Sequence, residues 1–348
     1  MTGKRSHHPF TAPAAGHSAA GDALPEAFRV SPEPFRYHTE AEVHAPLTAN
    51  PGDYLQFMRR TLTAIARGEA RLTLPPKQVF DDPATSGDFR VMPCELSYAG
   101  KVTKSVKLIG TNTVQRAVPD QITVGKLFVL DPVENFVSDV IEACLLSSAR
   151  TGACAALAVT ALARARAELV VVGSGRVGLY SAFYAAATGS VARIRFCDLV
   201  PERARRAARW LAAAIPGVQC VASPVAAIES ADVVVLATTG AAPVSSPPGW
   251  SANLVVSLGA DTDTQSELDP AWSRYAEIYC DTLDSLRFGD LRAWIAARTA
   301  DPAAVSDLLA VLRSPPRDSG RPRVFISTGS ALLDNLTARY LMERAGAA

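Results

Sequence analysis

A glycine-rich segment near the middle of the chain has the spacing of a phosphate-binding loop. Gly173, Gly175 and Gly178 form the pattern G-x-G-x-x-G directly after an apolar run. Such glycines allow a tight turn, close approach of the backbone to a pyrophosphate, and close packing of the next helix on the strand. Free N–H groups at the start of that helix bind the phosphates. We therefore expect Gly173, Gly175, Arg176, Val177 and Gly178 to bind a dinucleotide.

A carboxylate follows this pattern at the distance that a dinucleotide site requires. Asp198 stands about twenty residues beyond Gly178, at the end of the next apolar run. A carboxylate there accepts hydrogen bonds from the ribose hydroxyls and repels a 2′-phosphate. The following arginines, Arg203, Arg205 and Arg206, could attract that phosphate, but they also fit the solvent-exposed face of a helix. The pattern predicts NAD as the cofactor, with NADP less favoured.

Two later apolar runs also end in residues that suit a ligand site. One leads into Thr238 and Thr239, and the next leads into Gly259 and Asp261. In an open α/β sheet, ligands bind at the carboxyl ends of the strands. We therefore expect Thr238, Thr239 and Gly259 to lie beside the cofactor. On position alone, Asp261 fits a ligand-binding carboxylate and a turn or helix N-cap equally well.

The distribution of histidine and cysteine narrows the chemistry. All five histidines lie within the first 44 residues, and the six cysteines are scattered without a Cys-x-x-Cys pair. This pattern disfavours Ser-His-Asp triads, Cys-His nucleophiles and zinc sites, and it is typical of reduced, mostly buried thiols. The chemistry must then depend on carboxylates, lysine, arginine or a cofactor, and we predict no metal.

Composition and charge disfavour two kinds of partner. The chain has 348 residues, with 35 Lys and Arg against 34 Asp and Glu. This balance lacks the basic footprint of a nucleic-acid-binding protein. The longest stretch of small apolar residues, 152–163, is shorter than the roughly 20 residues that span a bilayer, and no signal segment is visible. We expect a cytoplasmic protein with neither a nucleic-acid partner nor a membrane.

Three stretches of the chain differ in pattern. Residues 1–33 are rich in Ala, Pro, Gly, Ser and His, which predicts a disordered tail. The next stretch predicts an α+β part with one meandering sheet. Its elements are a strand at 35–39, an amphipathic helix at 54–68, and strands at 78–80, 89–92, 105–109 and 126–130.

From about residue 155, strands and helices alternate, which is typical of a doubly wound parallel sheet. We therefore predict an α/β fold with a Rossmann-like sheet over 153–316. Its expected strands lie at 169–172, 192–196, 218–222, 233–237 and 254–258, with helices from 177 and over 201–215. A strand at 323–327 and a helix at 332–343 close the chain.

Five short segments occur in the order found in one known family. Residues 259–269 read G-A-D-x5-E-L-D, and residues 329–334 read G-S-A-L-L-D. Residues 148–153 contain the pair Arg-Thr, residues 105–110 form a strand with a central lysine, and residues 90–93 read R-V-M-P. From about residue 35 to its end, the chain resembles the ornithine cyclodeaminase/mu-crystallin family.

The resemblance implies an enzyme that binds an amino-acid-like substrate carrying one or more carboxylates. Arg150 and Lys107 would bind the substrate α-carboxylate, and Lys77 would occupy the place of another basic residue. Asp261 would face the substrate nitrogen and Cα, so Asp261 and Lys107 are the candidate catalytic residues. Thr151, in the Arg-Thr segment, joins the expected cofactor-binding residues.

The resemblance also implies a split domain and a homodimer. Residues 34–152 and 317–348 would together form an α+β substrate-binding and dimerisation domain, with the NAD-binding domain at 153–316 inserted between them. The chain departs from the cyclodeaminases at Arg90, where they carry a glutamate. A positive charge there disfavours a diamine substrate and favours a second carboxylate.

Three functions follow as alternatives. In Arg90 and in the residues around Arg150, the chain is similar to the branch that oxidises N-(2-amino-2-carboxyethyl)-glutamate with NAD, giving 2,3-diaminopropionate for secondary metabolites. This similarity favours an opine-like or imino-acid dehydrogenase. The second alternative is a redox-neutral, ammonia-releasing ornithine or lysine cyclodeaminase. The third is a mu-crystallin-like binder of small molecules without turnover.

Overall fold

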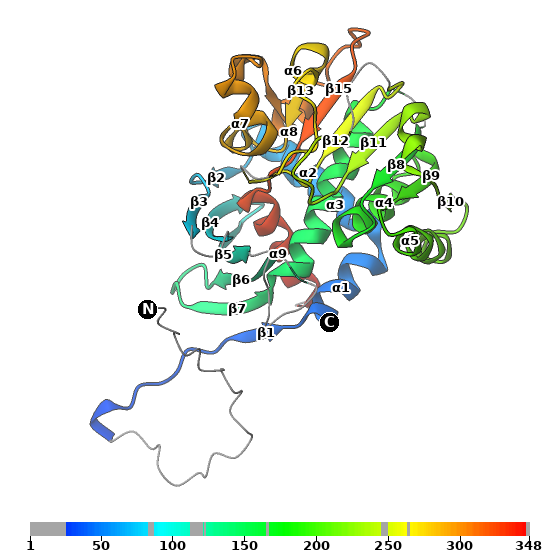
Figure 1. Ribbon diagram of the computed structural model, residues 1–348. Coiled ribbons are helices and arrows are strands. Elements are labelled where there is room, and N and C mark those ends of the chain that lie inside the picture. The colour runs from blue at the N-terminus through cyan, green and yellow to red at the C-terminus, as the bar shows by residue number, and fades with distance from the viewer. Residues whose placement is uncertain are drawn as a thin grey trace, which may run out of the picture. The chain divides into compact units, whose positions relative to one another are not determined.

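Two sheets organise the chain from Phe35 onward, as Figure 1 shows for this computed structural model. The structure describes residues 26–82, 87–111, 121, 123–164, 167–244, 250–262 and 265–345. Residues up to Pro34 form a separate unit, of which the described part contains one short 3-10 helix, Glu26–Phe28. The predicted disorder of residues 1–25 lies outside the described residues.

The first sheet has the order β1-β7-β6-β5-β4-β2, with β3 also paired to β4. Its strands pair antiparallel except for β1 on β7. The longest hairpin, β4–β5, turns at Ala99 and Gly100, both with positive φ, as a two-residue hairpin turn requires. The strands are β1 (Arg36–His38), β2 (Arg71–Thr73), β3 (Gln78–Asp82), β4 (Gly87–Tyr98), β5 (Lys101–Thr111), β6 (Thr123–Leu130) and β7 (Val137–Glu142).

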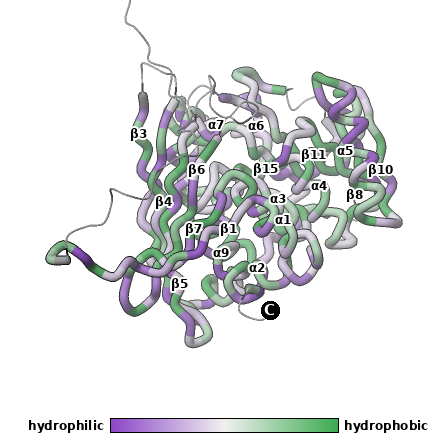
Figure 2. Tube along the Cα trace, turned by 90° about the horizontal axis from the view of Figure 1, so that it is seen from below, coloured by the Kyte–Doolittle hydropathy of each residue, from purple (hydrophilic) through white to green (hydrophobic). Residues whose placement is uncertain are grey.

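Burial alternates along β4 and β5 because one face of this sheet is covered. Figure 2 shows hydrophobic and hydrophilic segments side by side along these strands. The covering helices are α3 (Ala143–Leu162), which packs on β6, and α9 (Ala331–Ala345), which packs on β4 and β5. The predicted single meandering sheet is therefore present.

Two helices precede the first hairpin. The predicted helix at 54–68 is α2 (Pro51–Ala66), which begins at the N-cap Asn50. The helix α1 (Glu40–Ala49) was not expected, and it contains Pro46. It forms because Thr39 and Glu42 make a capping box at its start.

The second sheet is parallel throughout, with the order β10-β9-β8-β11-β12-β15-β13-β14. The chain turns back beside β8, so the switch in strand order falls between β8 and β11, where doubly wound folds bind dinucleotides. The strands are β8 (Ala167–Val172), β9 (Val191–Cys197), β10 (Gln219–Ala222), β11 (Val233–Leu236), β12 (Leu254–Ser257), β13 (Glu277–Cys280), β14 (Ser306–Asp307) and β15 (Arg323–Ile326).

Helices and 3-10 turns connect these strands. The predicted helices are α4 (Arg176–Ala187), which begins one residue before its expected start, and α5 (Pro201–Ala214), which ends one residue before its expected end. The other connections were not predicted from the sequence. They are η2 (Val225–Ser230), α6 (Trp272–Tyr275), η4 (Leu283–Arg287), α7 (Gly289–Ala296), η5 (Pro302–Ala304) and α8 (Leu308–Arg313).

The strand β15 corrects the predicted domain boundary at residue 317. It pairs with β12 on one side and β13 on the other, so it belongs to the second sheet rather than to the substrate part. Four buried residues in a row fit a central parallel strand. Of the predicted C-terminal segment 317–348, the helix α9 packs on the first sheet, against β4 and β5.

The helix α3 joins the two sheets. By length and composition its 20 residues could cross a membrane, and it is longer than the predicted apolar stretch at 152–163. Most of it is buried, however, and it packs against α4, α1 and α9. Gly152 allows the contact with α4, since a Cβ there would lie 2.6 Å from the backbone of Tyr180. The helix is therefore the common core of both halves.

Candidate active site

The glycine-rich loop joins β8 to α4 at the switch point of the second sheet. Gly173 has φ +95°, and a Cβ there would lie 2.3 Å from the carbonyl oxygen of Ala237. A Cβ on Gly178 would lie 2.0 Å from the Gly173 oxygen. A Cβ on Gly175 would meet nothing within 4 Å. The protein's own packing therefore explains the first and last glycines, and the space at Gly175 is open to a ligand.

The start of α4 has the features of a phosphate site. Gly175 is its N-cap, and within the described part of the chain no side-chain cap is present there. Free amides and the positive end of the helix dipole favour an anion there. Asp198 steadies the loop, because its carboxylate accepts from the backbone N–H of Ser174 at 2.8 Å and of Val200 at 2.9 Å. It lies at the end of β9, as predicted.

Arg176 connects the nucleotide loop to the other half of the molecule. Its guanidinium donates to both carboxylate oxygens of Glu40 on α1, at 2.6 and 3.0 Å. One turn further along α4, the Tyr180 hydroxyl lies 2.5 Å from Nδ1 of His44. These two contacts hold α1 against the start of α4.

A buried carboxylate, Glu267, ties the neighbouring strand ends together. Its two oxygens accept from the backbone N–H groups of Thr238, Leu258 and Gly259, and from the hydroxyls of Thr238 and Ser257. The five distances lie between 2.7 and 3.0 Å. Burial raises the pKa of Glu267, although these hydrogen bonds oppose the effect. The carboxylate thus fixes the ends of β11 and β12.

One cavity of about 370 Å³ contains the predicted nucleotide and substrate residues together. Three of the predicted cofactor residues, Gly173, Gly178 and Asp198, are not among the residues that line it. Thr151 lines it, but its hydroxyl donates to the Ser147 carbonyl within α3. The predicted residues that line the cavity are Lys77, Arg90, Lys107, Arg150, Thr151, Gly175, Arg176, Val177, Thr238, Thr239, Gly259 and Asp261.

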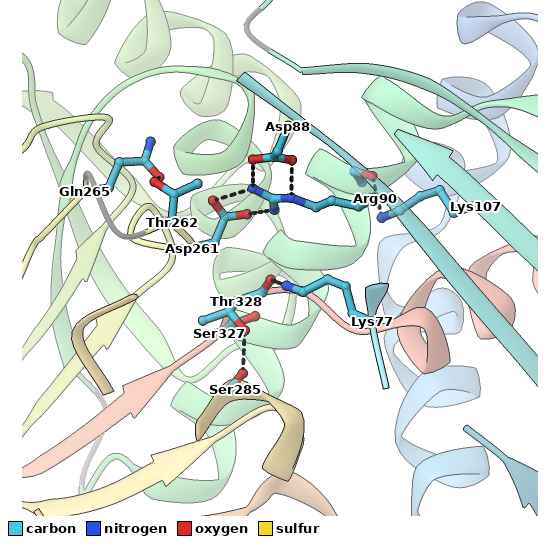
Figure 3. Close-up of polar contacts among 12 residues, drawn as sticks. Lys77, Asp88, Arg90, Lys107, Asp261, Thr262, Gln265, Ser285, Ser327 and Thr328 are labelled. Atoms are coloured by element: carbon cyan, nitrogen blue, oxygen red, sulfur yellow. Dashed lines mark hydrogen bonds and ion pairs between the residues drawn. The ribbon is translucent and has the colours of Figure 1, made fainter. Parts of the chain in front are cut away.

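Arg90 lies between two carboxylates, as Figure 3 shows. Its Nε and Nη2 atoms contact the two oxygens of Asp88 at 2.7 and 2.9 Å. Its Nη1 atom contacts Asp261 at 2.5 Å. The side chains of Arg90 and Asp88 are 7% and 8% exposed, whereas Asp261 is one-third exposed and reaches the cavity. Both edges of the Arg90 guanidinium are therefore occupied.

Lys107 and Arg150 share a single buried carboxylate. The Nζ atom of Lys107 lies 2.7 Å from Asp334, and Nε of Arg150 lies 2.9 Å from its other oxygen. Burial lowers the pKa of Lys107 to about 8, against the opposing effect of Asp334. Burial would raise the pKa of Asp334, but its two cations hold it below the ordinary value. This trio thus keeps one positive charge.

Lys77 approaches the same cavity from the segment before β3. Its Nζ donates to the Thr328 carbonyl at 2.8 Å and lies 3.8 Å from the centre of the Phe288 ring (Figure 3). Burial lowers the pKa of Lys77 to about 8, although Asp261 opposes the shift. An ammonium group with such partners is well suited to bind a ligand carboxylate.

The charge on Asp261 follows from these neighbours. Burial would raise the pKa of Asp261, but Arg90 and Lys77 lower it below the ordinary value. The group is therefore ionised at neutral pH. It is better suited to stabilise a positive nitrogen than to accept a proton from it.

Three residues of the site were missed or left without a role by the sequence analysis. Asp334 and Glu267 stand in quoted segments, but nothing in the pattern gave their partners. Asp88 had no signal beyond its position two residues before Arg90 on one strand, which puts both side chains on one face. Among the described residues, no group of three or more His, Cys, Asp or Glu is placed to hold a metal ion.

The fold and the site define a class of protein. A doubly wound sheet with a glycine-rich loop at its switch point shares one cavity with a set of buried cations, which is the arrangement of a dinucleotide-dependent enzyme for small anionic substrates. The chain belongs to the ornithine cyclodeaminase/mu-crystallin family, whose model matches residues 38–348.

Two curated relatives align with most of the chain. The NAD(P)H-dependent anabolic L-arginine dehydrogenase DauB of Pseudomonas aeruginosa is 29% identical over 306 residues, which cover 84% of this chain and 93% of the relative. The L-lysine cyclodeaminase of Streptomyces rapamycinicus is 28% identical over 300 residues, which cover 82% of this chain and 85% of the relative.

A solved structure has the same fold. The Δ1-pyrroline-2-carboxylate reductase of Thermococcus litoralis, in complex with NADH and L-proline, superposes with a TM-score of 0.79 at 18% identity. The match covers 89% of this chain and 97% of the other. The comparisons confirm the predicted family, the Rossmann-like fold, and an enzyme class that uses a nicotinamide dinucleotide.

Proposed function

We propose that this protein is an NAD(H)-dependent oxidoreductase that acts on the Cα–N bond of a small amino or imino acid. One observation carries the proposal: the start of α4 and the substrate cations, with Asp261, line a single cavity. A phosphate site and a carboxylate site that open into the same space suit a reaction between a dinucleotide and an amino acid.

The residues of the cavity have distinct roles in this proposal. Lys107, Arg150 and Lys77 bind the substrate carboxylate. Asp261 faces the nitrogen and stabilises its positive charge as the C=N bond forms. In the oxidative direction, the substrate loses a hydride from Cα and a proton from nitrogen. The nicotinamide, when bound, supplies the hydride acceptor.

Asp198 supports the choice of NAD over NADP. Its carboxylate lies at the end of β9 and is fixed by two backbone amides. A second negative group, such as a 2′-phosphate, would be repelled there. Of the three arginines that could attract that phosphate, Arg205 pairs with Glu202 on the exposed side of α5. Arg203 and Arg206 are exposed on the same helix.

A cyclodeaminase is the second candidate, because a relative of similar identity bears that name. Such an enzyme returns its hydride to the substrate and releases ammonia without net NADH. Arg90 argues against it, since it stands where the cyclodeaminases carry a glutamate and it already pairs with Asp261. A binder without turnover is a third possibility, and the intact set of Asp261, Lys107 and Arg150 argues against it.

The decisive experiment follows NADH and ammonia together. The protein is incubated with NAD and a panel of amino acids, and both products are measured. The proposal expects NADH in proportion to the oxidised product, and a large loss of activity in Asp261→Asn. Ammonia from ornithine or lysine without NADH would instead establish the cyclodeaminase.

We also propose a homodimer that uses the outer face of the first sheet. Phe80 and Phe89 stack there with ring centres 4.6 Å apart, and both are close to half exposed. Leu108 on β5 is 44% exposed. Adjacent exposed apolar side chains favour a protein contact. Light scattering on the full chain tests this, and a monomer at micromolar concentration would contradict it.

A further inference from the structure

Asp88 has a geometry that its position in the sequence does not suggest. It lies on β4, two residues before Arg90, and its carboxylate is 8% exposed. Both of its oxygens contact the same guanidinium, at Nε and Nη2. This side-on pair is the strongest arrangement available to arginine and a carboxylate, and it fixes the guanidinium in both position and plane.

The orientation imposed by Asp88 determines what Arg90 can do. With Nε and Nη2 on Asp88, the remaining edge points at Asp261, which it contacts through Nη1 at 2.5 Å and through Nη2 at 3.5 Å. A substrate carboxylate could bind Arg90 only by displacing the buried Asp88 or the partly exposed Asp261. Arg90 is therefore withheld from the substrate, in contrast to the expectation that it favours a second carboxylate.

The ion pairs of the site are balanced in charge. Arg90, Lys107 and Arg150 pair with Asp88, Asp261 and Asp334, which gives three charges of each sign. Lys77 adds one further cation, near Asp261, Asp281 and Asp284, and one substrate carboxylate can bind it. A second carboxylate would have no cation of its own, and burying an unpaired charge is unfavourable.

Part of the remaining wall is apolar, although uncharged polar residues such as Thr111, Thr123 and Gln265 also line the cavity. Met92 and Ile109 lie on β4 and β5 beside the cations, and Leu258 follows β12. All three line the cavity with apolar atoms. They suit a hydrocarbon side chain better than a second charged group.

We infer that Asp88 is a specificity-determining positioning residue, which holds Arg90 on Asp261 and so reserves the site for substrates with one carboxylate and a neutral side chain. The inference rests on the proposed function for the identity of the reaction. It concerns which acid the site accepts, and it can be measured by binding as well as by turnover.

The test compares one-carboxylate and two-carboxylate substrates in Asp88→Asn. This variant keeps the size of the side chain but loses its charge, so Arg90 becomes available. We expect wild type to prefer alanine or valine over aspartate and glutamate. In the variant, the ratio of kcat/KM for the two-carboxylate acids to that for the one-carboxylate acids should rise at least about tenfold, mainly through a lower KM.

Two further variants separate positioning from a general effect of charge or folding. Asp88→Glu should restore most of the wild-type preference. Asp81→Asn, on the exposed cross-strand neighbour in β3, makes the same charge change without touching Arg90 and should leave the ratio within about twofold. Thermal unfolding of each variant reports whether the fold is retained.

Calorimetric titration with propionate and succinate, in the presence of NADH, makes the outcome independent of turnover. Stronger binding of succinate in Asp88→Asn, with wild type favouring propionate, supports the inference even if the proposed reaction fails. A wild type that prefers succinate and aspartate, an unchanged ratio in Asp88→Asn, or an equal shift in Asp81→Asn would overturn it. Absence of turnover with every acid tested would count against the proposed function alone.

Discussion

Glu267 on the nucleotide side and Asp334 on the substrate side are both buried carboxylates, each 1% exposed, yet their surroundings are opposite. Glu267 accepts from backbone amides and hydroxyls. Asp334 contacts the charged groups of Lys107 and Arg150. The pKa of Glu267 is raised by burial, whereas the pKa of Asp334 is lowered because its cations outweigh burial.

The different surroundings of Glu267 and Asp334 indicate how each half of the cavity recognises its ligand. The nucleotide half is built from backbone positions. Glu267 fixes the ends of β11 and β12, and Gly175 leaves open space at the start of α4. The substrate half is built from side-chain charges, and its aspartates set how much positive charge is left. Shape therefore governs the first half, and charge governs the second.

The largest expected effect on stability comes from removing the charge of Asp334 on the substrate side. Asp334→Asn leaves two buried cations without a carboxylate, so the free energy of unfolding should fall by about 3–5 kcal/mol. Chemical denaturation measures this. The exposed ion pair of Glu202 with Arg205 provides the control, and Glu202→Gln should leave the stability almost unchanged. Equal losses in the two variants would contradict the account.

Glu267→Gln tests the nucleotide side of the comparison. An amide has one accepting oxygen, so some buried N–H or hydroxyl donors would lose their partner, and stability should fall by about 2–3 kcal/mol. Because the ends of β11 and β12 line the cavity, NADH binding should weaken as well. Ser257→Ala, which removes one of the five hydrogen bonds, should have a smaller effect, about 1 kcal/mol. Unchanged NADH binding in Glu267→Gln would contradict the claim that Glu267 fixes the nucleotide side of the cavity.

Two glycines of the loop lack a side chain for different reasons: Gly173 packs against the protein, and Gly175 faces open space. Gly175→Ala should leave thermal stability unchanged, because its Cβ meets nothing within 4 Å. It should weaken NADH binding about tenfold, since the backbone approaches the pyrophosphate there. Gly173→Ala should instead lower stability, because of its positive φ and its 2.3 Å contact. Loss of stability in both variants would show that the space at Gly175 is not kept for a ligand.

A change of pH should affect substrate binding but leave nucleotide binding almost unchanged. Lys77 and Lys107 have pKa values lowered to about 8, so they lose their protons as the pH rises through that value. KM for the amino acid should then rise, by up to about tenfold per pH unit, while the Kd of NADH changes little. Lys77→Arg, whose charge persists, should reduce the rise. A flat KM between pH 7 and 9.5 would contradict the assignment.

Much of the fold was predictable because it depends on local patterns. The apolar runs matched strands such as β8, β9 and β11, and the glycine spacing predicted the turn into α4. The helix α1 was not predicted; it contains Pro46, a residue that is unfavourable inside helices. The position of β15 was also missed, since a short apolar run says nothing about which strands lie beside it.

The candidate site was predictable in residue type but not in pairing. Asp261, Lys107 and Arg150 follow from spacing and resemblance. The ion pair between Arg90 and Asp261, however, joins residues 171 positions apart. Which carboxylate neutralises which cation depends on how two sheets meet across α3, and a one-dimensional pattern does not contain that information.

The most direct test of the central claim follows the hydrogen on the reacting carbon. The protein is incubated with NAD and amino acids deuterated at Cα, and the NADH formed is analysed by mass spectrometry. The account predicts one deuterium in each NADH, accumulating in proportion to the oxidised amino acid. Ammonia release with the deuterium retained in the product, and no labelled NADH, would contradict it.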